Sequence, residues 1–161
     1  FAAEAQLFLT SHHALFQATA RSAKVASVLL PQNIDAIRER LPANSAKTAA
    51  DALLGNFHTK VFCSNDHVGT NEWAAKLVGE EWQTRSNVST SLGGEGSMSA
   101  GTVESRRFLV NPIEFARLAK GGPENDGRVE AILYRSGRPF AAAGTNHLRV
   151  AFPQDMIGGT P

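Results

Sequence analysis

The sequence predicts an α/β fold with a largely parallel sheet and an antiparallel edge in its last third. Short, almost wholly apolar runs alternate with helix-like segments over residues 1–83, the pattern of strands buried between helices. After residue 105, short strand-like segments follow one another with turn residues between them. With 161 residues and 42% hydrophobic content, the chain is long enough to bury one core.

The first elements are predicted from apolar spacing and from residues that begin or end a segment. Ser11 can cap a helix whose apolar residues recur at helical spacing and which reaches about Arg21. The apolar, β-branched run 25–30 then predicts a strand buried on both faces, which Pro31 ends. These segments form the first helix and strand of the expected sheet.

A helical crossover and a second strand follow. Short helices are predicted over 34–41 and 44–54, and residues 57–63 read as a second interior strand. Thr70 is placed to cap the next helix, and Gly79 is placed to end it. Connections of this kind favour parallel strands joined by right-handed crossovers.

The middle of the chain has a different composition. Residues 84–105 are rich in Ser, Thr, Gly and Asn, and they are expected to form a flexible polar loop. Residues 106–153 supply a short helix at 112–118 and then the closing strands of the same domain. The tail 154–161 is expected to be disordered.

The composition and net charge of the chain do not indicate which kind of partner it binds. The 16 basic and 15 acidic residues give a net charge of +1, so no overall field favours nucleic acid or membrane. The single cysteine, Cys63, excludes an internal disulfide, fits a reducing compartment and is expected to be a buried strand residue. No Cys/His spacing resembles a zinc site, and no apolar run approaches the ~20 residues of a membrane span.

Three polar residues are candidates for chemistry because each is placed near a strand end or a helix end. Ligands of open α/β sheets bind at such an edge. Glu4 suits a general base acting on water that attacks a phosphoryl group, or else a helix N-terminal acid bound by backbone amides. Gln32 is a residue that orients this water, or a turn residue. Arg21 is an arginine finger, or a cation that complements a helix C-terminus.

Aromatic and basic residues beside the polar loop give weaker indications. Trp73 and Trp82 suit either core packing, the stronger reading for Trp73, or a stacking platform for single-stranded nucleic acid. The arginines that flank the loop are able to contact phosphates without sequence preference. They are Arg85, Arg106 and Arg107.

The stretch FAAEAQLFLTSHHALFQATARSAKVASVLLPQN resembles the core of the TraG/TraD-like coupling ATPases of conjugative type IV secretion. In that family an acidic pair ends the Walker B strand, a QATARS segment follows, and TQN closes the next strand. The resemblance continues through LLGNFHTKVFCSND, HVGTNEWAAKLVGEEW, SRRFLVNPIEFARL and RVAFPQ, so it covers nearly the whole chain. It implies a RecA-like three-layer αβα motor domain that forms homo-hexamers.

This resemblance also implies an activity and partners. Coupling ATPases use ATP and Mg²⁺ to drive DNA or nucleoprotein into a secretion channel from the cytoplasmic side of the bacterial inner membrane. Relaxosome proteins and secretion-channel proteins are the implied protein partners. The alternative function is a module that recognises substrate or relaxosome proteins without catalysis, and a third possibility is an inactive remnant.

Individual positions follow from the same resemblance. Glu4 matches the second Walker B acid, which activates water, Gln32 matches the polar sensor, and Arg21 matches the arginine of the ATARS segment. Ala3 stands where the family carries the aspartate of the magnesium shell, and Pro31 replaces a threonine.

The sequence contains no GxxxxGK[ST] loop to hold phosphates. In the resembled family this loop lies upstream of the Walker B strand. The expectation is therefore an incomplete motor domain, its C-terminal portion, without ATPase activity of its own.

Overall fold

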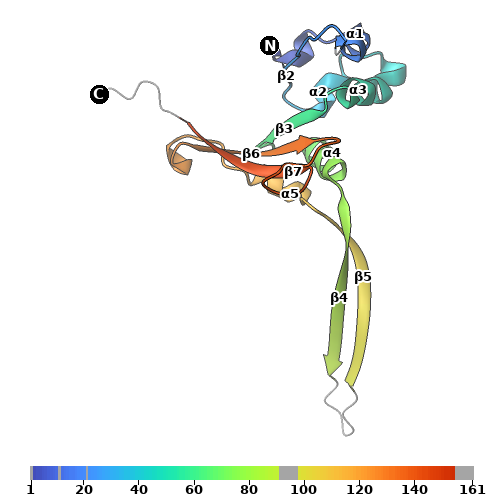
Figure 1. Cartoon of the computed structure of the whole chain (residues 1–161), viewed down its shortest axis with the longest axis vertical. Helices are drawn as coiled ribbons and strands as arrows, with labels where there is room; N and C mark the ends of the chain where they lie inside the picture. Colours follow the sequence, from blue (N-terminus) through green and yellow to red (C-terminus); the bar gives the residue numbers. More distant parts are fainter. Residues whose placement is uncertain (1, 11, 21, 91–97, 155–161) are drawn as a thin grey trace.

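The computed structural model describes residues 2–10, 12–20, 22–90 and 98–154. It consists of an N-terminal lobe made mostly of helices, a central lobe with a three-stranded sheet, and a long two-stranded arm (Figure 1). The N-terminal lobe extends to residue 57, and the arm leaves the central lobe on the side away from it. Within the described residues no helix has the length and apolar character needed to cross a membrane.

Helices dominate the N-terminal lobe, and the three that were predicted are confirmed. The strand predicted over 25–30 is much shorter than expected, and Val25 and Val28 are exposed. Its two residues pair in parallel with a short strand at residues 2–3, so that Ala2 lies opposite Leu29. The elements are β1 (Ala2–Ala3), the 3-10 helix η1 (Ala5–Leu7), α1 (His12–Ala20), β2 (Leu29–Leu30), α2 (Ile34–Arg38) and α3 (Ala46–Gly55).

The core of this lobe is small and aliphatic. Leu53 on α3 is 1% exposed, and Ile37 on α2 is 3% exposed. They pack with Leu9, Leu41 and Ala50 in one cluster. The helices therefore meet through the spaced apolar residues that predicted them.

The prediction of a largely parallel sheet is wrong for the main sheet, which is antiparallel. Its strand order is β3-β6-β7, with β3 at Thr59–Cys63, β6 at Arg128–Arg135 and β7 at His147–Pro153. Phe62 lies opposite Ile132 in the antiparallel ladder. An apolar run indicates a buried strand but carries no information on its direction, so the alternation of elements misled the prediction. The antiparallel pairing predicted for the last third is confirmed in β6 and β7.

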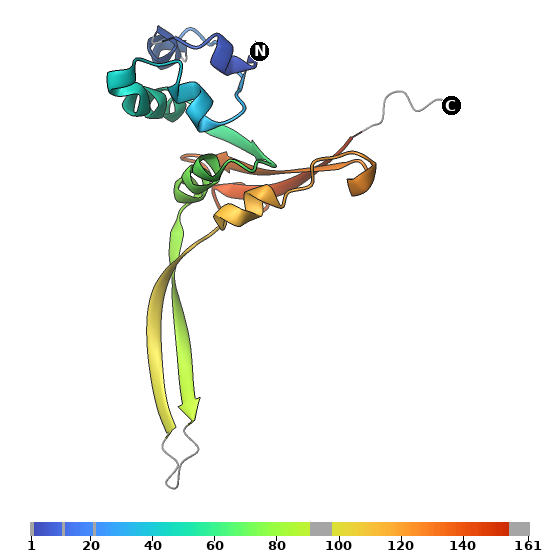
Figure 2. The same ribbon diagram turned by 180° about the vertical axis from the view of Figure 1, so that it is seen from behind.

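Two helices cover one face of this sheet (Figure 2). They are α4 (Val68–Val78) and α5 (Pro112–Ala116). Phe115 is 1% exposed, and the Phe62 ring meets it edge-on with centroids 5.6 Å apart. Trp73 makes a similar contact with Phe62 at 5.8 Å, so it serves in core packing as the sequence indicated.

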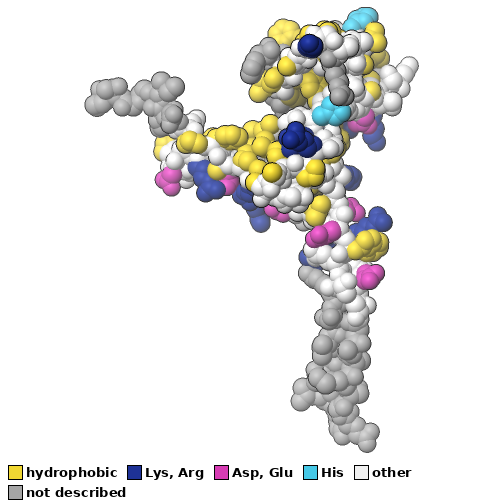
Figure 3. Space-filling model, viewed as in Figure 1, with side chains coloured by type: hydrophobic (Ala, Val, Ile, Leu, Met, Phe, Trp, Pro, Cys, Tyr) yellow, Lys and Arg dark blue, Asp and Glu magenta, His cyan; other side chains and the backbone are white. Residues whose placement is uncertain are grey.

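The opposite face of the sheet is apolar and uncovered. Val61 is 55% exposed and Phe152 is 48% exposed. Cys63 is exposed too, so the prediction of a buried cysteine is wrong. β3 is an edge strand, and in the part of the chain that the structure describes no helix packs over this face. Figure 3 shows apolar side chains gathered over the sheet on this side.

The arm corrects the prediction of a flexible loop over 84–105. β4 (Glu80–Thr90) and β5 (Met98–Phe108) form an antiparallel ladder that runs from Glu80 opposite Phe108 to Thr90 opposite Met98. At the root β5 contacts α4, and beyond it the arm extends away from both lobes (Figures 1 and 2). The ladder is held by hydrogen bonds between backbone groups, which every residue type except proline is able to make. A polar segment therefore forms it without the apolar alternation by which a strand is recognised in a sequence. The segment 91–97 and most of the predicted tail (155–161) lie outside the described residues.

Candidate functional site

Glu4 stands between β1 and η1 in an unusual backbone conformation. Its φ of 51° lies in the left-handed region, which is uncommon for a residue other than glycine and costs free energy. Its carboxylate makes no capping bond to η1. Oε2 instead accepts hydrogen bonds from the side-chain amides of Gln6 and Gln32. The geometry therefore differs from that of a helix-capping acid.

Gln32 is the residue that the structure brings to Glu4. Its Nε2 donates to Glu4 Oε2 at 2.9 Å. The contact forms because β1 and β2 are parallel neighbours, so the residues that follow them emerge at the same edge. Arg21, the third predicted residue, lies outside the described residues.

Asn65 ties the end of β2 to the turn between β3 and α4. Its Nδ2 donates to the Gln32 carbonyl oxygen at 2.9 Å, and its Oδ1 accepts from the His67 backbone N–H at 2.6 Å. The buried Asn71 donates from its own Nδ2 to the Asn65 carbonyl at 2.8 Å. Both ends of this turn are therefore held by side-chain amides.

His67, rather than the predicted Thr70, caps α4. The Thr70 backbone N–H donates to His67 Nδ1 at 3.1 Å, while the Thr70 hydroxyl accepts from the Ile34 N–H at 3.1 Å. His67 Nε2 lies 3.3 Å from Asp35 Oδ2, and Arg38 contacts the other oxygen of Asp35 at 2.7 Å. Because Nδ1 acts as an acceptor, the hydrogen of a neutral ring is placed on Nε2.

These contacts form one polar network from Glu4 through Gln32, Asn65 and His67 to Asp35. It runs along the boundary of the two lobes. The exposed carboxylate of Glu4 is held by amide donors, whereas the Asp35 carboxylate, with its side chain 48% exposed, is paired with Arg38 and His67. Chemically the Glu4 carboxylate is able to accept a proton. Sequence reasoning missed Asn65 and Asp35. The available signal for Asn65 was its position two residues after the end of a strand, which is also the position of Gln32.

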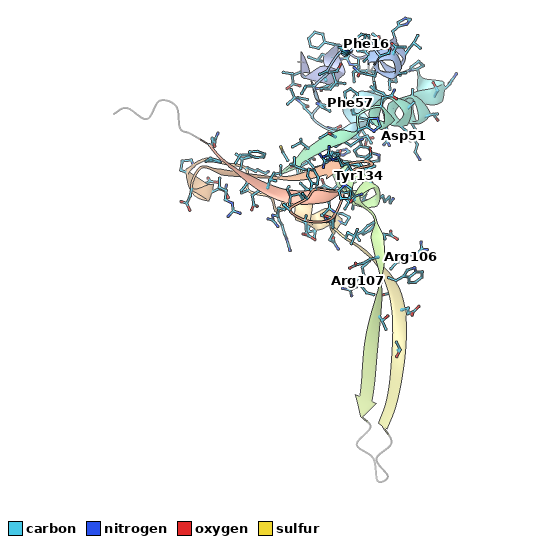
Figure 4. All side chains as sticks on the ribbon, viewed as in Figure 1. Phe16, Asp51, Phe57, Arg106, Arg107 and Tyr134 are labelled. Carbon is cyan, nitrogen blue, oxygen red and sulfur yellow. The ribbon has the colours of Figure 1, made fainter. Side chains whose placement is uncertain are left out.

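The root of the arm carries a second group of candidate functional side chains. The Arg106 guanidinium lies 4.8 Å from the centroid of the Trp82 ring, and Trp82 is 64% exposed. Glu80 and Glu81 line the same cavity of about 400 Å³. Figure 4 labels Arg106 and the exposed Arg107 at this root, and Figure 3 shows charges of both signs there. Trp82 is therefore outside the core.

The residues that the structure describes contain no group of three His, Cys, Asp or Glu side chains that is able to hold a metal ion. Ala3 contributes no side-chain oxygen beside Glu4.

A family model described as the TraM recognition site of TraD and TraG matches residues 9–120. The chain belongs to this family. The match confirms the resemblance to TraG/TraD-like coupling proteins. Gln32, the α4 cap and the arm lie inside the matched region, whereas Glu4 precedes it and β6 follows it. Among curated protein sequences, none matches this chain.

Proposed function

We propose that this chain is the part of a conjugative coupling protein that recognises a relaxosome protein. The observation that carries the proposal is the match to the TraM recognition family, which spans α1 to α5 and the arm. Recognition needs no nucleotide, so the missing phosphate loop is compatible with it.

The root of the arm supports this function. Trp and Arg are the residues that most often dominate the binding energy of protein interfaces. Trp82 and Arg106 stack on each other and Trp82 is largely exposed, with Glu80 and Glu81 beside them. A mixed-charge surface around an exposed aromatic ring suits a protein partner.

The test is a binding measurement between the chain and the TraM-type protein of the same conjugative system. Saturable binding by biolayer interferometry is expected, and Trp82→Ala should weaken it about tenfold or more, as for an interface hot spot. The matched control is Phe16→Ala, which removes an exposed aromatic ring on α1 that lines neither cavity. Absence of a complex with the unaltered, folded chain would contradict the recognition function.

A second candidate function is favoured by one contact, the 2.9 Å hydrogen bond from Gln32 to Glu4. In this proposal the longer coupling protein is a RecA-like homo-hexamer that uses ATP and Mg²⁺ to drive DNA or nucleoprotein into a secretion channel. It works at the cytoplasmic side of the inner membrane. Glu4 accepts a proton from water, Gln32 orients that water, and Arg21 reaches a neighbouring subunit's site.

The residues of this chain do not fit ATP and Mg²⁺ on their own. The sequence has no phosphate-binding loop, and Ala3 lacks the oxygen that a magnesium shell needs. Under this proposal, phosphate and metal are held by residues beyond the 161, and the isolated chain does not hydrolyse ATP.

DNA-stimulated ATP hydrolysis by the complete coupling protein tests the motor function. Glu4→Gln should reduce turnover by roughly 10²–10⁴-fold, the contribution of a general base. Glu39→Gln removes an exposed glutamate on the same lobe and serves as the control. Equal turnover in both variants would exclude Glu4 as the base.

A further inference from the structure

A cavity of about 430 Å³ lies between α3 of the N-terminal lobe and β3 and α4 of the central lobe. Figure 4 shows Asp51 on the side of α3 that faces the sheet, with Tyr134 of β6 below it. Glu4 does not line this interlobe cavity, which adjoins the polar network through Arg38, the partner of Asp35. The charged residues that line it are Arg38, Lys47, Lys60, Lys76, Asp51 and Glu72.

Positive charge exceeds negative charge in the cavity, and most of it is unpaired. Arg38 has a carboxylate partner in Asp35 at 2.7 Å. In the described part of the chain, no carboxylate lies within 4.0 Å of the ammonium groups of Lys47, Lys60 or Lys76. Three cations therefore remain available to an anionic ligand.

Lys60 is the least hydrated of these cations. Burial lowers the pKa of its ammonium group. Its Nζ donates to the Phe57 carbonyl and lies 5.8 Å from the centroid of the Tyr134 ring, and these neighbours carry no negative charge. A carboxylate that enters the cavity would restore part of the interaction lost with water.

The remaining wall favours a peptide over a nucleic acid. Leu54, Leu77 and Trp73 provide apolar contact area beside the lysines. Asp51 and Glu72 would repel a continuous phosphate backbone. Alternating acidic and apolar side chains match the lining better, and the volume lies within the range of about 300–1,000 Å³ typical of ligand pockets.

We propose that the interlobe cavity binds an acidic, partly apolar segment of the partner protein, with its carboxylates on Lys47, Lys60 and Lys76. The proposal rests on the proposed recognition function and names the chemistry of the partner. Lys76 also lines the cavity beside Trp82, so a bound segment is able to continue to the root of the arm.

Trp73 is a built-in reporter for this cavity. The sequence has two tryptophans, so a Trp82→Phe variant leaves Trp73 as the single tryptophan, whose emission is excited selectively over that of tyrosine. The probe is the peptide acetyl-Asp-Leu-Asp-Phe-Glu-amide, and its Asn/Gln counterpart is the matched neutral peptide. A saturable change in Trp73 emission with the acidic peptide and none with the neutral peptide is the expected result.

Charge variants in this background test the sign of the interaction. The double variant Lys47→Gln, Lys76→Gln should weaken peptide binding by about tenfold, because two charge pairs of roughly 0.7 kcal/mol each are lost. Asp51→Asn should strengthen it about threefold by the same reasoning. Lys120→Gln, an exposed lysine that does not line the cavity, should change nothing. Stronger peptide binding by the double lysine variant together with weaker binding by Asp51→Asn would overturn the proposal, because it would indicate that the cavity prefers a basic ligand.

Further outcomes separate this inference from the function on which it rests. A stronger emission change with pyrophosphate or a thymidine oligonucleotide would overturn it in favour of a phosphate ligand. If the TraM-type protein binds the unaltered chain and a Lys47→Gln, Lys76→Gln variant that retains Trp82 equally well, the cavity proposal fails while the recognition function stands. If that protein binds neither, the recognition function fails, and the peptide titration still shows whether the cavity accepts acidic segments.

Discussion

His67 Nε2 lies 3.3 Å from Asp35 Oδ2, and this contact joins the start of α4 to α2 across the boundary between the lobes. The other ring nitrogen of His67 accepts the Thr70 backbone N–H, so one side chain both caps a helix and holds two lobes together. The interlobe cavity and the root of the arm both include residues of α4. The position of α4 relative to the N-terminal lobe therefore depends in part on His67.

Replacing His67 separates its two roles. His67→Ala removes both the cap and the contact with Asp35, and we expect a loss of about 1–2 kcal/mol in the free energy of unfolding. His67→Asn keeps a capping acceptor and loses only the longer reach to Asp35, so its cost should be smaller. Urea unfolding followed by circular dichroism measures both values. Equal losses would show that the cap contributes nothing.

Acid should destabilise the central lobe through Glu130. This buried carboxylate on β6 accepts a hydrogen bond from Arg149 at 2.8 Å, which is the main reason that its pKa is lowered, and another from the Ala119 backbone N–H. Since the folded pKa lies below the unfolded one, its stabilisation is complete above the ordinary glutamate pKa. It is lost as the pH falls through the folded value.

The measurement is the urea midpoint of the chain between neutral and acidic pH. Glu130→Gln should lower the midpoint at neutral pH and make it less sensitive to acid. Glu124→Gln, an exposed glutamate in the turn before β6, is the control and should leave the acid dependence unchanged. The same acid dependence with and without Glu130 would contradict the role of this carboxylate.

The sequence predicted the helices well because their signals are local. Ile37 and Leu53 each lie three or four residues from another apolar residue of the same helix, and Gly79 directly follows α4. These signals therefore depend only on residues a few positions apart. Strand direction and the arm depend on pairing between distant segments. Apolar content marked the β3 segment as a strand without giving its direction, and the polar β4 offered no pattern at all.

The sequence also predicted only part of the candidate site. Glu4 and Gln32 could be identified from their positions after apolar segments, and the structure places them in contact. The contact of His67 with Asp35 depends on how α4 packs beside α2, which no local pattern encodes.

The central core should be sensitive to loss of volume at Phe115. This ring is 1% exposed and packs edge-on against Phe62. Phe115→Ala leaves a cavity under the sheet, and we expect a loss of about 3–5 kcal/mol in the free energy of unfolding. Thermal and urea unfolding measure it. Ile113→Ala, on the exposed side of α5, is the control and should cost much less.

The uncovered face of the central sheet should drive self-association of the isolated chain. Val61 lies opposite Leu133, which in turn lies opposite Leu148, so apolar residues cross all three strands on this face. Exposed apolar patches of this kind mark surfaces that bind other molecules or aggregate.

Val61→Thr combined with Phe152→Thr keeps β-forming residues and removes apolar area. We expect the double variant to bind less of an apolar dye such as anilinonaphthalene sulfonate and to show a smaller apparent mass in light scattering. Leu15→Thr, on the exposed side of α1, removes a similar side chain elsewhere and should leave both readings unchanged. If the sheet variant and this control behave alike, the sheet face is not the surface through which the chain associates.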